Sequence, residues 1–355
     1  MNDSENIVIA TAERIFADLA DPQTINACND QTWKAPLWTA LSESGLTLAW
    51  VPEAYGGAGA DLAEGFGVIG AAGRFALAVP LAETMLAGWL LAQAEIASPD
   101  GAMTVAPANP NDRIALDADG TLNGRARNVP FAREAGHIAV VADGGAGAVV
   151  ALAAAADCRI VPGESLAGDP SDAVIFDHVK PVAVMKANKA GVDAAGLMRM
   201  GALVRSLQIA GALQTALTLS VGYANERVAF EKPIAKFQAV QHSLARLAGE
   251  VAAAVTAAGS AAEAVAGGGC DDDALLLEIA AAKIRCAEAA EKAAAIAHQV
   301  FGAIGFTREH ILHRFTQRAL GWRDDFGNES DWAVRLGRSI AARGADALWP
   351  LVASR

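Results

Sequence analysis

The chain has 355 residues and a formal net charge of −12, so it lacks the excess of Lys and Arg that a nucleic-acid partner requires. Hydrophobic residues make up 53%, but much of this is alanine, and the acidic N-terminus lacks a secretory signal, so we expect a soluble cytoplasmic protein without a membrane span. The four cysteines show no C-x-x-C spacing and predict neither a disulfide framework nor a metal site.

The first part of the chain, residues 1–100, is predicted to be an N-terminal helical domain. Apolar residues recur at helical spacing from Ile7 to Leu19, and further helices are expected at 61–75 and 82–97. Between them lies the sequence Val51-Pro-Glu-Ala-Tyr-Gly-Gly-Ala-Gly59. Its glycines predict a loop with positive φ angles.

The middle part, residues 101–188, shows a different pattern. Short apolar runs such as 113–116, 137–142, 147–152 and 173–176 are separated by turn residues. This pattern is typical of a small antiparallel β domain.

The last part, residues 189–355, returns to helical spacing. Four long helices are predicted at roughly 192–225, 237–267, 272–304 and 330–347, with Asp271 to Asp273 as N-cap residues of the third. Four helices of this length predict a C-terminal four-helix bundle. The fold class is therefore α+β, with the β domain between two helical parts.

Two motifs stand at the ends of these helices. The first is Arg227-Val-Ala-Phe230-Glu231-Lys-Pro233-Ile234-Ala-Lys-Phe237-Gln238, where Pro233 breaks the helical pattern. It resembles the R-x-x-F-G-x-P-I-x-x-F-Q sequence of acyl-CoA dehydrogenase flavoproteins, with Glu231 in place of the usual glycine. The second, from Gln299 to Thr307, resembles the family's Q-x-x-G-G-x-G-F-T. The order and separation of the two motifs support the resemblance and the fold.

The resemblance implies FAD as the cofactor. Arg227 would pair with the pyrophosphate, because a guanidinium can hold two phosphate oxygens at once. Phe230, Gln238, Gln299 and Gly302 would line the adenosine portion. In this family these residues reach the FAD of a neighbouring subunit, so we expect a homo- or hetero-oligomer.

The flavin-ring side is poorly matched. The family has a loop like T-E-P-x-A-G-S-D in its β domain, whereas residues 103–112 of this chain share only Thr104 and a proline with it. Binding of the flavin ring by this chain alone is therefore doubtful.

The general base is missing at both family positions. Counting from Gln299 without a gap places the usual glutamate at Phe326, and counting back from Phe237 places the alternative at Gly201. Neither residue can accept a proton. Asp324, Asp325 and Glu329 are candidates if the loop is shifted, although such loop carboxylates are more often solvated.

In the family, a carboxylate removes the α proton of an acyl-CoA while the β hydride passes to flavin N5, which gives a 2-enoyl-CoA. The family also implies electron-transfer flavoprotein as the acceptor. Without a base, this chain resembles the short, non-catalytic chains that some bacterial enzymes pair with a complete catalytic chain. Our leading hypothesis is an FAD-dependent acyl-CoA dehydrogenase component whose glutamate comes from a partner. The alternatives are a self-sufficient homo-oligomer with an unusual base and a non-enzymatic helical scaffold.

Overall fold

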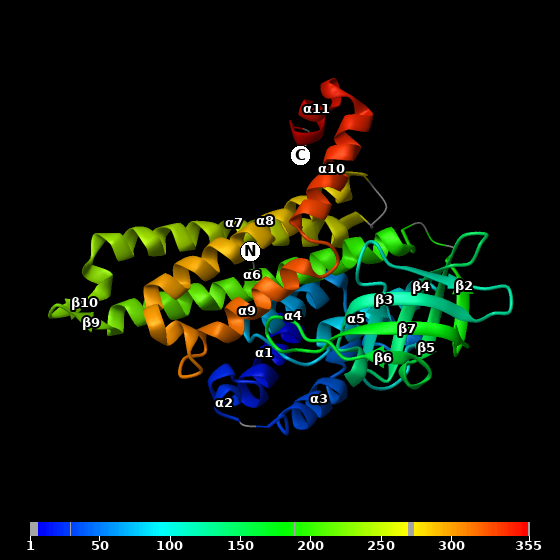
Figure 1. Cartoon of the computed structure of the whole chain (residues 1–355), viewed down its shortest axis with the longest axis horizontal. Helices are drawn as coiled ribbons and strands as arrows, with labels where there is room; N and C mark the ends of the chain where they lie inside the picture. The colour runs from blue at the N-terminus through cyan, green and yellow to red at the C-terminus, as the bar shows by residue number, and fades with distance from the viewer. Residues whose placement is uncertain (1–5, 29, 188, 190, 269–272, 354–355) are drawn as a thin grey trace.

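The computed structural model describes residues 6–28, 30–187, 189, 191–268 and 273–353. A bundle of long helices sets the long axis of the molecule (Figure 1). A curled β sheet lies at one end of the bundle, and a small hairpin lies at the other. The N-terminal helices cover one side of the bundle beside the sheet.

The N-terminal domain consists of α1 (Ile7–Leu19), α2 (Pro22–Ala27), α3 (Lys34–Glu43), α4 (Leu62–Arg74) and α5 (Leu81–Gln93). Helix α5 ends earlier than predicted, before Glu95, which adopts a φ of +61°. The predicted glycine loop is confirmed, since Gly56 and Gly59 have φ angles of +90° and +70°.

Glycines also allow the N-terminal domain to dock closely on the bundle. A Cβ at Gly211 of α6 would lie 2.3 Å from the carbonyl oxygen of Gly70, and a Cβ at Gly73 would lie 2.3 Å from that of Gln208. Real Cβ atoms do not approach that closely, so the two helix backbones are in direct contact. This contact fixes the position of α5, which follows α4 and is almost entirely buried.

The β domain is one curled sheet with the strand order β6-β7-β3-β2-β4-β5-β8, and β1 pairs with β4. Most neighbours are antiparallel, as predicted, but β1 and β2 both pair with β4 in parallel. The strands are β1 (Met103–Ala106), β2 (Arg113–Leu116), β3 (Leu122–Pro130), β4 (His137–Asp143), β5 (Ala148–Ala154), β6 (Arg159–Val161), β7 (Ser171–Val179) and β8 (Ala183–Lys186).

The C-terminal part contains α6 (Ala194–Glu226), α7 (Gln238–Gly268), α8 (Asp273–Phe301), α9 (Leu312–Asp324), α10 (Glu329–Arg343) and α11 (Leu348–Ala353). Between α6 and α7, β9 (Val228–Ala229) and β10 (Lys232–Pro233) form the terminal hairpin. The predicted cap at Asp271 to Asp273 lies outside the residues whose side chains are described.

The predicted fourth helix of the bundle, at 330–347, is wrong, because α9 takes that place. Helix α9 packs on α6 and α8, whereas α10, predicted as the fourth helix, packs on α8 and projects from the body with α11 (Figure 1). The buried residues Leu312, Phe315, Ala319 and Trp322 have helical spacing, but polar residues surround them and obscure the pattern.

Among the described helices, α7 alone has the length and apolar composition to cross a bilayer. Its buried side chains, including Leu247 and Val251, belong to the core that α6, α8 and α9 share. We therefore assign α7 to the bundle.

Candidate functional site

The hairpin at the tip of the bundle carries the first motif. Arg227 ends α6 with an exposed side chain, and Phe230 is 89% exposed. Phe230 and Glu231 have φ angles of +53° and +65°, the combination that a tight type I′ hairpin requires. Lys232 lies 4.5 Å from the ring centroid of Phe237 and supports the base of the hairpin.

The second motif lies at the same end of the bundle. Tyr223 of α6 stacks on Phe301 of α8, with ring centroids 4.3 Å apart, and Gly302 follows directly. Gly302 has a φ of +63°, and no atom lies within 4 Å of where its Cβ would be, so its backbone is open to a ligand. Gln238 and Gln299 are exposed as well. All five predicted adenosine-side residues are therefore exposed and lie at the same end of the bundle.

The two predicted base positions touch each other at the opposite end of α6. A Cβ at Gly201 would lie 2.4 Å from the ring of Phe326, which is 1% exposed. The backbone of Phe326 has a φ of +57°; its N–H donates to the carbonyl of Ala108 at 3.1 Å, and its carbonyl accepts from Trp332 Nε1 at 3.0 Å. The loop is thus fixed with an aromatic ring against a glycine.

The three nearby carboxylates do not replace the missing base. Asp325 accepts a hydrogen bond from Nε of Arg205 at 2.9 Å. Glu329 is paired with Arg323, which lowers the pKa of its carboxyl group. Asp324 is exposed, and its partial desolvation raises its pKa. The structure therefore does not show any of the three carboxylates positioned as a base beside Gly201 and Phe326.

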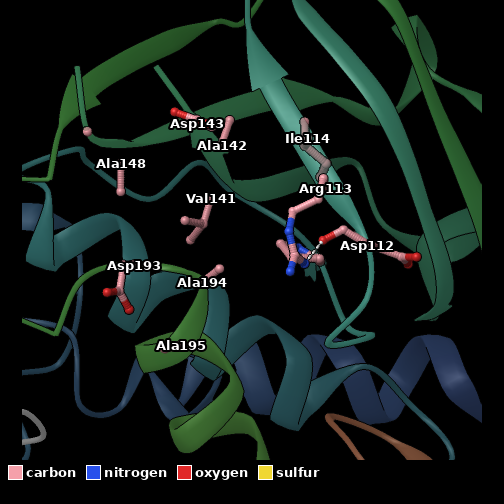
Figure 2. Close-up of a pocket in the computed structure, with 12 residues that line it drawn as sticks. Asp112, Arg113, Ile114, Val141, Ala142, Asp143, Ala148, Asp193, Ala194 and Ala195 are labelled. Carbon is pink, nitrogen blue, oxygen red and sulfur yellow. Dashed lines mark hydrogen bonds between the residues drawn. The ribbon is translucent and has the colours of Figure 1, made fainter. Parts of the chain in front are cut away.

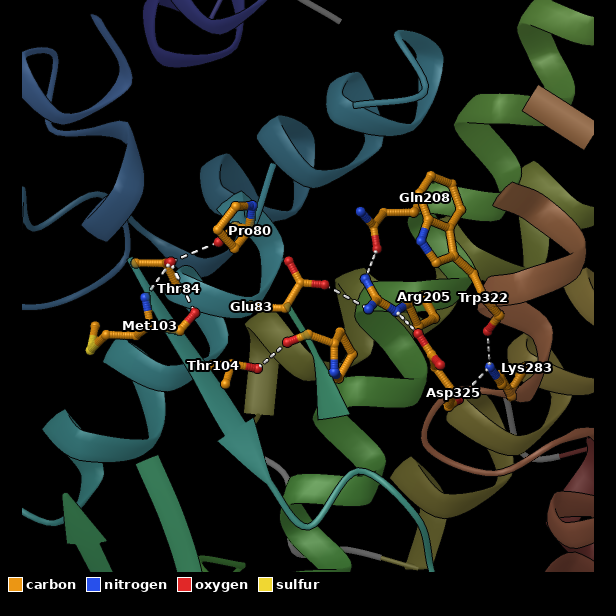
Figure 3. A network of polar contacts seen from close by, with 11 residues as sticks. Pro80, Glu83, Thr84, Met103, Thr104, Arg205, Gln208, Lys283, Trp322 and Asp325 are labelled. Carbon is orange, nitrogen blue, oxygen red and sulfur yellow. Dashed lines mark hydrogen bonds and ion pairs between the residues drawn. The ribbon is translucent and has the colours of Figure 1, made fainter. Parts of the chain in front are cut away.

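A buried charged network, which sequence reasoning missed, is centred on Arg205 (Figure 3). Arg205 is 2% exposed and donates to Glu83 at 2.6 Å, to Gln208 at 2.5 Å and to Asp325. Its guanidinium also lies 5.8 Å from the ring centroid of Phe326. Burial raises the pKa of Glu83 although Arg205 opposes this, and the two carboxylates raise the pKa of Arg205 although burial opposes this.

Lys283 of α8 closes the same network from the other side. It is fully buried and donates to the carbonyls of Trp322 and Asp325, each at 2.8 Å, so it holds the end of α9 (Figure 3). Burial lowers the pKa of its ammonium to about 8. A charged residue within an otherwise apolar helix face was the available sequence signal for both Arg205 and Lys283.

The cavity beside Arg205 is too small for a flavin ring. The cavity between the sheet and the bundle, lined by Phe131, Arg205, Trp322 and others, has a volume of about 20 Å³, which holds about one water. Thr104 is buried, and its hydroxyl donates to the carbonyl of Pro130 at 2.7 Å, so it is not free for a ligand. The interior beside Arg205 therefore leaves no room for a flavin ring, whereas the five predicted adenosine-side residues are exposed.

A more open cavity of about 280 Å³ lies between the sheet and the start of α6 (Figure 2). Its carboxylates are already engaged: Asp112 with Arg127, Asp143 with the N–H of Gly145, and Asp193 with the N–H of Gly196. Each carboxylate that lines this cavity therefore already has a structural partner.

Both helical parts of the chain match models of one protein family. Residues 2–95 match the N-terminal domain of acyl-CoA dehydrogenases, and residues 192–326 match their C-terminal domain. The chain is 28% identical to acyl-CoA dehydrogenase IpdE2 of Mycobacterium tuberculosis over 88% of this chain and 89% of that protein. It is also 28% identical to acyl-CoA dehydrogenase FadE27 of the same organism, over 88% and 90% of the two chains.

Solved structures share the whole fold. The ChsE4–ChsE5 complex from Mycobacterium tuberculosis has a TM-score of 0.84 and 24% identity, over 96% of this chain and 98% of that chain. A variant of the Tcur3481–Tcur3483 steroid ACAD has a TM-score of 0.82 and 25% identity, over 95% and 98%. The chain therefore belongs to the acyl-CoA dehydrogenase family, oxidoreductases whose cofactor is FAD.

Proposed function

We propose that this chain is the non-catalytic component of a heteromeric acyl-CoA dehydrogenase. The observation that carries the proposal is the contact between Phe326 and Gly201, because both family positions for the base are filled without a carboxylate. The small cavity around Arg205, which holds about one water, supports the proposal that the flavin ring is not bound there. The ring and the glutamate would then belong to a partner chain.

The chain's own contribution lies at the hairpin. Arg227, Phe230, Gln238, Gln299 and Gly302 would hold the adenosine and pyrophosphate part of an FAD that the partner shares. The flavin of the bound FAD would accept the hydride. Arg227 would neutralise phosphate charge, Gly302 would admit the ligand to its backbone, and the exposed ring of Phe230 would cover the nucleotide.

The substrate in this proposal is an acyl-CoA thioester. The similarity to a steroid ACAD with two differently named chains supports a bulky, steroid-derived acyl group and a heteromeric assembly. We further propose electron-transfer flavoprotein as the electron acceptor and the cytoplasm as the location.

The test is reconstitution with a longer acyl-CoA dehydrogenase chain that carries the glutamate. We expect acyl-CoA oxidation only from the complex, since loss of a general base costs about 10²- to 10⁴-fold. Glutamine in place of the partner's glutamate should abolish turnover, whereas Asp324→Asn and Glu329→Gln should matter little. Turnover by the pure chain, abolished by either of these two substitutions, would identify a self-sufficient enzyme. A complex without bound flavin would instead favour a scaffold.

A further inference from the structure

A separate polar cavity of about 410 Å³ lies between α2, the β6–β7 loop and the first half of α9. Arg308, His313, Arg314 and Arg318 line it, together with the amides of Asn26 and Gln317. None of its described lining residues is Asp or Glu, although the whole chain has a net charge of −12. The cavity therefore concentrates positive charge in an acidic protein.

The arginines are only partly compensated. Arg318 is 5% exposed; its Nη2 donates to Asp169 at 2.7 Å and its Nη1 to the carbonyl of Arg314 at 3.2 Å. The Nε atoms of both Arg314 and Arg318 are buried and have no hydrogen-bond partner within the described part of the chain. Burial and the nearby charge of Arg318 lower the pKa of Arg314 to about 10. Buried cations with unused donors are costly unless an anion satisfies them.

We propose that this cavity binds the diphosphate group of a small phosphorylated ligand. Guanidinium groups match phosphate oxygens in a two-point geometry, and the first turn of α9 adds the positive end of a helix. Nδ2 of Asn26 donates to the carbonyl of Arg308 at 2.7 Å and so positions Arg308 at the rim. A cavity of this volume is within the range of small-ligand sites.

This site is distinct from the adenosine-side surface, because Arg227 does not line it. Thr307, the last residue of the second motif, forms one wall, so the two sites are neighbours. The proposal does not depend on the heteromeric function, since it rests on this chain's own cavity.

The test is titration calorimetry of the full chain with inorganic diphosphate, carried out in an Arg227→Ala background so that the hairpin contributes no phosphate contact. We expect saturable binding that weakens about ten- to hundred-fold in Arg314→Gln and in Arg308→Gln. Arg246→Gln, at an exposed position on α7, is the matched control and should bind as before.

Arg308 is exposed, so its variant keeps the fold even if Arg314→Gln does not, and circular dichroism checks both. ADP should bind at least as tightly as diphosphate and show the same loss in both variants, which would identify a nucleotide source. The absence of diphosphate binding, or equal affinity in Arg308→Gln and Arg246→Gln, would overturn the proposal.

Discussion

Arg205 is the residue on which the closed interior beside Phe326 depends. It pairs with two carboxylates, Glu83 and Asp325, in the interior of the protein. Arg205→Met should destabilise the protein by about 3–5 kcal/mol in urea unfolding, because it leaves buried carboxylates without a partner. The double variant Arg205→Met/Glu83→Met should lose clearly less than the sum of the two single losses. Additive losses would show that the buried pair is not coupled.

Lys283 gives the stability of the protein a dependence on alkaline pH. The pKa of its ammonium is about 8 in the folded chain, whereas an exposed lysine, as in the unfolded chain, has a pKa of 10.5. Between these two pH values the unfolded chain therefore binds more protons than the folded chain. The free energy of unfolding should therefore rise with pH in this window, by at most about 1.4 kcal/mol per pH unit from this group.

The comparison of Lys283→Met with the unmodified chain isolates this contribution. The variant should lack the rise between pH 8 and 10.5 when urea unfolding is measured across the window. Lys292→Met, at an exposed position on the same helix, should retain it. Equal pH slopes for Lys283→Met and the unmodified chain would contradict the burial argument.

The sequence predicted the site unevenly at this scale. The five adenosine-side residues stand in two motifs, so their position at one end of the bundle followed from the order of the helices. The contact between Gly201 and Phe326 could not be predicted in this way. The two residues are 125 positions apart, and the spacing of apolar residues within a helix does not show which distant residue packs against that helix. The partners of Arg205 were equally hidden, since burial of a charge is decided by tertiary packing.

At the level of elements, the hairpin between α6 and α7 is strained at Glu231. A φ of +65° destabilises a residue that has a side chain by about 1–2 kcal/mol, and glycine avoids this strain. Glycine also loses more conformational entropy on folding, which offsets part of the gain. We expect Glu231→Gly to raise the free energy of unfolding by about 0.5–1 kcal/mol. Glu231→Ala removes the charge but keeps the strain, so it should show no such gain. Thermal unfolding of both variants and of the unmodified chain measures the difference. Equal stability of the two variants would exclude backbone strain as the cause.

Element prediction succeeded where apolar periodicity was uninterrupted and failed where it was not. Helices α6, α7 and α8 follow long alanine-rich stretches and were found nearly to their ends. Helix α9 was missed because its apolar positions are few, although they pack into the same core. The parallel pairing of β1 with β4 was also missed, since alternation within a strand does not determine the direction of its neighbour.

Across the whole molecule, α6 separates the two halves of the proposed cofactor site. Gly201 and Arg227 lie near opposite ends of this helix, about 39 Å apart at about 1.5 Å per residue. The adenosine-side residues and the Phe326 region of one chain therefore cannot serve the same reacting centre. In the function proposed above, a second chain would complete each cofactor site.

This separation leads to a prediction for the assembled protein. Arg227→Ala should weaken retention of FAD by the reconstituted complex about ten- to hundred-fold, because a charge-assisted contact to phosphate contributes about 1.5–3 kcal/mol. The variant should still assemble, since the Arg227 side chain is exposed and the backbone of this residue, which the substitution keeps, makes the hydrogen bonds to Tyr223 of α6 and to Ile234. The ratio of flavin absorbance to protein after gel filtration measures retention, and light scattering measures assembly. Arg246→Gln serves as the exposed control, and an unchanged flavin ratio in Arg227→Ala would remove the hairpin from the cofactor site.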